Sequence, residues 1–334
     1  EMTSSLVGSE MCIRDSYKGI GTFLDEMKEQ CFDKYNCMTV AEAPGVDDAA
    51  FERYAGKNGY FSMIFDFGWE NMEGENDKSS IHAVERWKKK MFTHVAHNSG
   101  IGWSAIFLEN HDQSRCLNKF LERENISFYS ASALASIYFF LYGTPFIYQG
   151  QEIGMTNVKW KNINDMDDIR AKRTYEEAVG QGKDPEEVLA YFSELGRDNA
   201  RTPMQWDDSE NAGFTTGTPW IKVNDNYDKI NAKSQVDDPD SIFSCYKKLV
   251  QLRKDYPVFV DGKFTLLLED DENIFAYSRK NEEKTMIVVC NFFDKEIPMP
   301  LAKECEGMEV LISNYKDTSD MSVLRPYEAR MYIR

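Results

Sequence analysis

The sequence has few of the residues that most often mark metal sites and disulfide frameworks. It contains four histidines, and its seven cysteines are odd in number and form no C-x-x-C pair. Scattered cysteines of this kind are typical of free thiols in a reducing cytoplasm, and they argue against a disulfide framework or a zinc site. We therefore expect a cytoplasmic protein with no metal at these groups, and we interpret His94 and His97 as ordinary helix residues.

Positive charge and long apolar runs are scarce as well. The chain has 39 Lys and Arg against 56 Asp and Glu, a formal net charge of −17. Such a balance disfavours nucleic acid and anionic membrane surfaces as partners. The longest apolar run, residues 131–148, is broken by Gly143-Thr144-Pro145, so no run is long enough to span a membrane. We expect no nucleic-acid or membrane partner.

The first 16 residues, EMTSSLVGSEMCIRDS, show no helix or strand periodicity and lack the basic and apolar regions of a signal peptide. The stretch MCIRD is one reading frame of the end sequence that transposon-based sequencing kits add to DNA, and LVGSE fits the bases upstream of it. We therefore expect residues 1–16 to be a non-native leader, with native sequence beginning near Tyr17.

Short apolar strands alternate with helical patterns through the first two thirds of the 334 residues. The expected strands are 38–41, 62–65, 104–108 and 146–148, and the expected helices are 23–32, 80–98, 131–142 and 185–195. Such alternation indicates βα units around a parallel sheet, and the strands are apolar enough to be covered on both faces. Asp184-Pro185 is a strong helix start for the last of these helices.

The pattern changes near Pro257. From there short strands follow one another, separated by charged turns, at 264–267, 274–277, 286–289 and 330–333. This spacing predicts a small antiparallel β domain. The expected organisation is a leader over 1–16, a βα domain over 17–256 and a β domain over 257–334.

Two carboxylates stand where predicted strands end. Glu42 follows the strand 38–41, and Asp112 follows the strand 104–108 within FLENHDQSR. In a βα barrel the carboxyl ends of the strands open on one face, which is where active sites lie, so these two carboxylates are expected to converge. Paired carboxylates without a metal suit glycoside hydrolysis.

Four stretches carry a resemblance to a known family: MTVAEAPGV, FLENHDQSR, GTPFIYQGQEIGMTN and GRDNARTPMQWDDSENAGFTTGTPWIKVNDNY. Together they resemble the α-amylase superfamily, glycoside hydrolase family 13, in its oligo-1,6-glucosidase and α-glucosidase branch. The resemblance runs from about Tyr17 to Arg334. It implies an α/β fold in which the C-terminal half of a (β/α)8 TIM barrel is followed by a small all-β sandwich.

The resemblance also implies roles for individual residues. Glu42 matches the general acid/base, Asp112 the transition-state stabiliser, and His111 and Arg197 two groups that bind the innermost glucose. It implies no cofactor, and a structural calcium site, if the branch has one, would lie in the missing N-terminal part. The chain departs from the branch at Ala41 and Ala43, which flank the acid/base, and at Ser114, where proline is common.

Other residues near these stretches have less specific interpretations, and three aromatic residues keep two. The aromatic side chains of Trp206, Phe214 and Trp220 are either sugar-stacking platforms or parts of the core. We expect Arg201 to form a structural ion pair and Glu152 to hold the barrel mouth by hydrogen bonds.

The nucleophile motif of the family does not occur upstream of Glu42, so we expect a C-terminal part of an enzyme that is inactive alone. The full-length enzyme is expected to be a monomeric α-glucosidase that retains anomeric configuration on α-linked gluco-oligosaccharides. A trehalose-6-phosphate hydrolase and a sucrose isomerase stay open as alternatives, as does a non-catalytic relative like the heavy chains of amino-acid transporters. The linkage preference, α-1,6 or α-1,4, depends on the absent motif.

Overall fold

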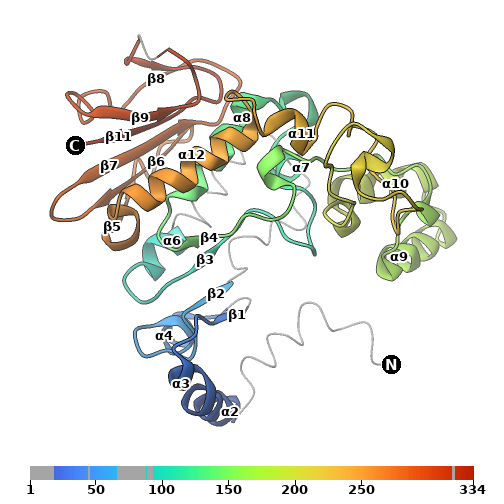
Figure 1. Cartoon of the computed structure of the whole chain (residues 1–334), viewed down its shortest axis with the longest axis horizontal. Helices are drawn as coiled ribbons and strands as arrows, with labels where there is room; N and C mark the ends of the chain where they lie inside the picture. Colours follow the sequence, from blue (N-terminus) through green and yellow to red (C-terminus); the bar gives the residue numbers. More distant parts are fainter. Residues whose placement is uncertain (1–18, 44–45, 66–87, 89–92, 318–319) are drawn as a thin grey trace.

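The computed structural model describes residues 19–43, 46–65, 88, 93–317 and 320–334 (Figure 1). The expected leader over 1–16 lies outside these residues, as does most of the helix expected over 80–98, of which the end is seen as α6 (Thr93–Asn98). Within the described part of the chain, no helix combines the length and the apolar character needed to cross a membrane.

Four short parallel strands form the centre of the βα part: β1 (Val40–Glu42), β2 (Met63–Phe65), β3 (Ala105–Ile106) and β4 (Thr144–Pro145). β1 pairs with β2 and β3 pairs with β4, both in parallel, and a parallel bridge between Ile64 and Ser104 joins the two pairs. The parallel order predicted from the sequence is confirmed. The expectation for the last strand was wrong: β4 lies wholly before the expected range 146–148. Gly143, at φ +143°, lies so close to the carbonyl of Ser104 that no Cβ would fit, so pairing with β3 begins at the next residue.

Helices follow the strands along the chain, as expected of βα units. The longer ones are α8 (Phe128–Phe139), α9 (Ile169–Gly180), α10 (Pro185–Leu195) and α12 (Ile242–Asp255). The shorter ones are α2 (Ile20–Met27), η1 (Lys28–Phe32), α3 (Asp33–Tyr35), α4 (Asp48–Ala55), α7 (Cys116–Phe120), η4 (Arg123–Asn125), η5 (Gln151–Ile153), η6 (Ile163–Asp165), η7 (Arg197–Asn199), η8 (Glu210–Gly213), α11 (Ala232–Gln235) and α13 (Val258–Asp261).

Helix α8 lies at the centre of the largest apolar cluster, between the βα part and the C-terminal sheet. It starts with a reciprocal capping box between Ser127 and Ser130, and all its residues from 130 to 139 are buried. The buried hydroxyls of Ser132 and Ser136 donate to carbonyls of the helix itself. At its other end Arg279 donates to the carbonyls of Phe140 and Leu141, both at 3.1 Å. These bonds join the helix to the sheet.

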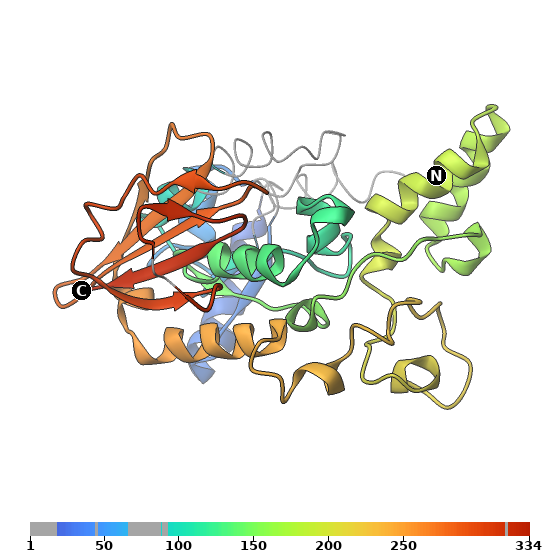
Figure 2. The ribbon, with the colours of Figure 1, turned by 90° about the horizontal axis from the view of Figure 1, so that it is seen from above.

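The C-terminal strands form an antiparallel sheet in the order β5-β6-β7-β11-β9. Their bounds are β5 (Lys263–Leu267), β6 (Ile274–Lys280), β7 (Thr285–Asn291), β9 (Glu309–Ser313) and β11 (Ala329–Ile333). A second apolar cluster covers the sheet, and near it β8 (Ile297–Pro298) pairs with β10 (Val323–Leu324). The sequence did not predict β8, β9 or β10. Figures 1 and 2 show this sheet at one end of the molecule and α9 with α10 at the other.

Candidate active site

Glu42 is the last residue of β1 and its side chain is exposed. It lies in register with Phe65 of β2, whose ring contacts Phe107 at a centroid distance of 5.1 Å and Phe146 at 4.7 Å. Phe65 is the last residue of β2, Phe107 directly follows β3, and Phe146 directly follows β4. They form an apolar floor beneath the carboxyl edge of the sheet, where Glu42 and the chain leading to Asp112 emerge.

Asp112 lies in the turn after β3 and is held by two arginines. Its Oδ1 accepts hydrogen bonds from Arg197 Nη1 at 3.2 Å and from Arg201 Nη2 at 2.6 Å. Arg201 also donates through Nε to the carbonyl of His111 at 2.8 Å, and His111 Nε2 lies 3.6 Å from Asp112 Oδ2. The structure thus brings three of the four predicted site residues together, and Arg201 makes an ion pair in the same group. The Asp112 side chain stays 49% exposed, so the carboxylate remains accessible.

Sequence reasoning missed a second aspartate at this site, Asp168. It receives two charge-assisted hydrogen bonds from Arg197, Nε to Oδ2 at 2.6 Å and Nη2 to Oδ1 at 2.7 Å. Burial disfavours the charged form of Asp168. The hydrogen bonds from Arg197 and from the backbone N–H of Arg170, together with the positive charges of Arg197 and Arg201, outweigh burial and lower the pKa of this carboxyl. The same contact raises the pKa of Arg197. The sequence signal was local: Asp168 immediately precedes a helix, which marks a capping residue rather than a partner 29 positions away.

A fully buried ion pair lies beneath the site. Arg115 Nη1 donates to Glu109 Oε1 at 2.9 Å and to the carbonyl of Gln149 at 2.7 Å, and Nη2 donates to the carbonyl of Ala200 at 3.3 Å. Glu109 also accepts the backbone N–H of Cys116 at 2.5 Å. Arg115 therefore joins three segments: the turn after β3, the loop after β4 and the loop that carries Arg197.

The structure also bears on two other interpretations made from the sequence, those of Glu152 and of three aromatic residues. Glu152 accepts the backbone N–H of Gly150 at 2.8 Å, and burial raises the pKa of its carboxyl. Trp206, Phe214 and Trp220 are 51%, 41% and 57% exposed, so none of the three is packed in the core that the described residues form. Sugar stacking by them stays a hypothesis.

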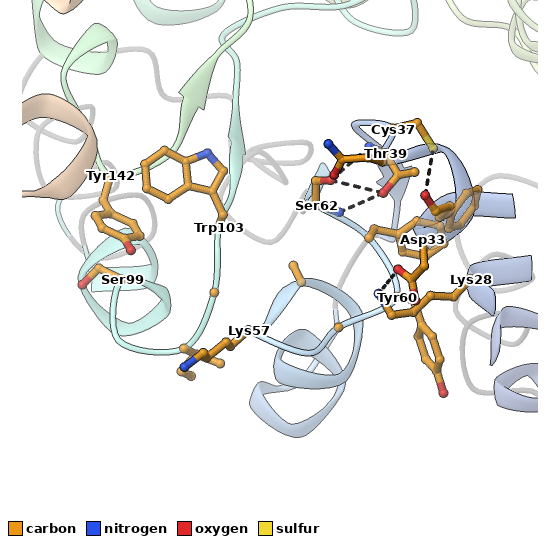
Figure 3. Close-up of a pocket in the computed structure, with 18 of the residues that line it drawn as sticks. Lys28, Asp33, Cys37, Thr39, Lys57, Tyr60, Ser62, Ser99, Trp103 and Tyr142 are labelled. Atoms are coloured by element: carbon orange, nitrogen blue, oxygen red, sulfur yellow. Dashed lines mark hydrogen bonds and ion pairs between the residues drawn. The ribbon is translucent and has the colours of Figure 1, made fainter. Parts of the chain in front are cut away.

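A cavity of about 600 Å³ opens at the opposite end of the strands (Figure 3). Its wall includes Thr39, Ser62, Trp103 and Tyr142, which precede β1, β2, β3 and β4. In βα sheets ligands bind at the carboxyl ends of the strands, so this cavity is not the candidate site. Among the described residues, no His, Cys, Asp and Glu side chains are grouped so that they could hold a metal ion.

The family model for the alpha amylase catalytic domain matches residues 13–262. The chain belongs to the alpha-amylase family. It is 40% identical over 331 residues to an oligo-1,6-glucosidase of Halalkalibacterium halodurans, a match that covers 94% of this chain and 58% of that protein. It is also 42% identical over 324 residues to an oligo-1,6-glucosidase of Parageobacillus thermoglucosidasius, covering 93% of this chain and 57% of that protein.

Solved structures of alpha-amylase family enzymes show the same fold. A trehalose-6-phosphate hydrolase of Bacillus licheniformis superposes with a TM-score of 0.85 at 36% identity, covering 94% of this chain and 59% of that one. An isomaltulose synthase of Klebsiella sp. LX3 gives a TM-score of 0.85 at 31% identity with the same coverage. The predicted fold, part of a TIM barrel followed by an all-β domain, is confirmed. The chain spans less than three fifths of the length of these relatives.

Proposed function

We propose that the full-length protein is a retaining glycoside hydrolase that acts on α-glucosidic bonds of short oligosaccharides, of the oligo-1,6-glucosidase or α-glucosidase type. We further propose that it works in the cytoplasm as a monomer. The observation that carries the proposal is the pairing of Asp112 with Arg197 and Arg201 at the carboxyl edge of the parallel strands where Glu42 also emerges. The similar oligo-1,6-glucosidases support the substrate class.

In this proposal Glu42 protonates the leaving oxygen and then activates water, which suits an exposed carboxyl at a strand end. Asp112 supplies fixed negative charge to the sugar ring as it becomes cationic in the transition state. His111 and Arg197 hold the sugar through hydrogen bonds to its hydroxyl groups. The nucleophile of a retaining reaction is a further carboxylate, and we assign that role to none of the 334 residues.

The decisive experiment is Glu42→Gln in the full-length protein, assayed on isomaltose and on p-nitrophenyl α-glucoside. Isomaltose needs protonation of its leaving group, whereas p-nitrophenolate leaves without it, so the loss of glycosylation rate is expected to be far greater on isomaltose. Equal losses on both substrates would refute the role of Glu42. NMR of the first product should show α-glucose, because two displacements restore the configuration.

A trehalose-6-phosphate hydrolase is the second candidate, because the chain is 36% identical to one from Bacillus subtilis and superposes on the one from Bacillus licheniformis. The ratio of kcat/KM for trehalose-6-phosphate to that for isomaltose distinguishes the two. A ratio well above one would favour this alternative. Products of sucrose analysed in the same assay test the isomerase alternative that the isomaltulose synthase structure raises.

A further inference from the structure

The helical segment formed by α9 and α10 leaves and rejoins the rest of the molecule at the candidate site. It begins directly after Asp168 and ends directly before Gly196-Arg197. Asp168 caps α9 by accepting the N–H of Arg170 at 2.9 Å, and it binds Arg197 through both carboxylate oxygens. One side chain therefore joins the two ends of the segment to each other.

The same contacts belong to a closed ring of charged residues at the site. One link of this ring is a backbone N–H of one residue bonded to the carboxylate of another, and the other links join side chains. The backbone at Asp168 is fixed by a second aspartate: Asp198 Oδ2 accepts the backbone N–H of Asp168 and that of Asp167, both at 2.8 Å. Asp198 Oδ1 lies 3.5 Å from Arg201 Nη1, and Arg201 returns to Asp112. The ring members are Asp112, Arg197, Asp168, Asp198 and Arg201. The side chains of Asp168 and Asp198 are buried, at 7% and 0% exposure, while that of Asp112 is half exposed.

The contact with Asp168 fixes the orientation of the Arg197 guanidinium. Its contact with Asp112 is a single bond of 3.2 Å, whereas its contact with Asp168 has two shorter bonds in parallel. A planar guanidinium held at two of its three nitrogens, Nε and Nη2, by a buried carboxylate loses most of its rotational freedom before substrate arrives. Asp168 also balances the charge of Arg197, which shares Asp112 Oδ1 with the second guanidinium of Arg201.

We propose that Asp168 is a positioning residue that presents Arg197 to Asp112, so that the entry of the α9–α10 segment sets the geometry of the innermost sugar site. This inference rests on the proposed function for its substrate. Asp168 itself acts through Arg197 and is not assigned a contact with the sugar.

The test compares Asp168→Asn with Asp184→Asn in the full-length protein. The two substitutions are matched, because Asp184 caps α10 through Glu186 N at 2.9 Å as Asp168 caps α9, and asparagine keeps the cap in both. Asp184 contacts neither Arg197 nor Asp112 in any hydrogen bond or ion pair within the described residues. The pair thus separates loss of a capping carboxylate, which both variants share, from loss of the negative charge that faces Arg197, which only Asp168→Asn causes.

The first readout is calorimetric binding of 1-deoxynojirimycin, a cationic mimic of the glucosyl transition state, beside hydrolysis of p-nitrophenyl α-glucoside. In Asp168→Asn the dissociation constant should rise and kcat/KM should fall, each by about ten- to a hundredfold, because small displacements of binding groups cost this much. The binding stoichiometry should stay at that of the wild type. Asp184→Asn should change both quantities less than twofold. A change in stoichiometry without a change in dissociation constant would show a purely structural role and overturn the proposal.

The second readout needs no activity. Amide hydrogen exchange of the segment 109–116, which carries Asp112, should become faster in Asp168→Asn and stay unchanged in Asp184→Asn. If the wild type hydrolyses no α-glucoside, the proposed function fails, and exchange alone decides whether Asp168 holds this segment. If the wild type is active but Asp168→Asn binds the mimic as tightly and exchanges as slowly, the proposed function stands and the positioning role is refuted.

Discussion

Glu109→Gln should destabilise the protein strongly, because it leaves the buried charge of Arg115 without a counterion. The guanidinium has 0% side-chain exposure, and its other acceptors are neutral: the carbonyls of Gln149 and Ala200 and the thioether sulfur of Met155. Breaking one side of a buried ion pair costs about 3–5 kcal/mol of unfolding free energy. Since a glutamine oxygen can still accept the N–H of Cys116, we expect the loss to come from the charge rather than from that bond.

Urea unfolding followed by fluorescence and circular dichroism measures this loss as a shift of the transition midpoint at constant slope. The control is Asp208→Asn, which breaks an exposed pair with Lys233 whose side chains are 65% and 70% exposed, and which should leave the midpoint unchanged within error. Glu109→Leu combined with Arg115→Met should recover most of the stability, because neither charge is then buried alone. A loss below about 1 kcal/mol in Glu109→Gln would refute the reasoning.

Three further outcomes are expected. In the full-length protein Asp112→Asn should cost several kcal/mol of transition-state stabilisation, equally for good and poor leaving groups, because the charge of Asp112 acts on the sugar ring. A loss of kcat/KM that differs between substrates with good and poor leaving groups would contradict this. Glu152→Gln should raise the unfolding free energy at pH 7, because burial raises the pKa of Glu152 and its ionisation then costs stability. Below the ordinary carboxyl range it should leave the unfolding free energy unchanged, because the glutamate is protonated in both the folded and the unfolded state. Urea midpoints at pH 7 and at about pH 3 check the sign. The exposed thiols of Cys31 and Cys37 should react quickly with a disulfide reagent. Mass mapping should find the buried thiols unmodified in the native protein, namely Cys116, Cys290 and Cys305.

Local patterns in the sequence were enough to predict many of the elements. The helix over 185–195 starts and ends where expected, because its start depends on Asp184 capping the adjacent turn and on Pro185 at the first helical position. Three of the four parallel strands, β1, β2 and β3, were found because their short apolar runs end at charged residues, whereas β4 lies before its expected range. The strands β8 and β10 were missed because each has two residues, too few to show any periodicity.

The carboxylates were located by the same means. Glu42 and Asp112 follow apolar strands, and the carboxyl ends of parallel strands lie at one edge, so sequence order alone brings them to that edge. This inference requires only the direction of each strand.

What the sequence could not show is which charge is paired with which. Asp168 and Arg197 are 29 residues apart, and Arg115 reaches Gln149 and Ala200 across 34 and 85 positions. Asp168 precedes a helix and Glu109 follows a strand, so helix capping and exposure at a strand end explain them locally and point to no distant partner. Their long-range partners depend on how the loops fold over the sheet, and burial, which makes those pairs matter energetically, exists only once the chain is packed.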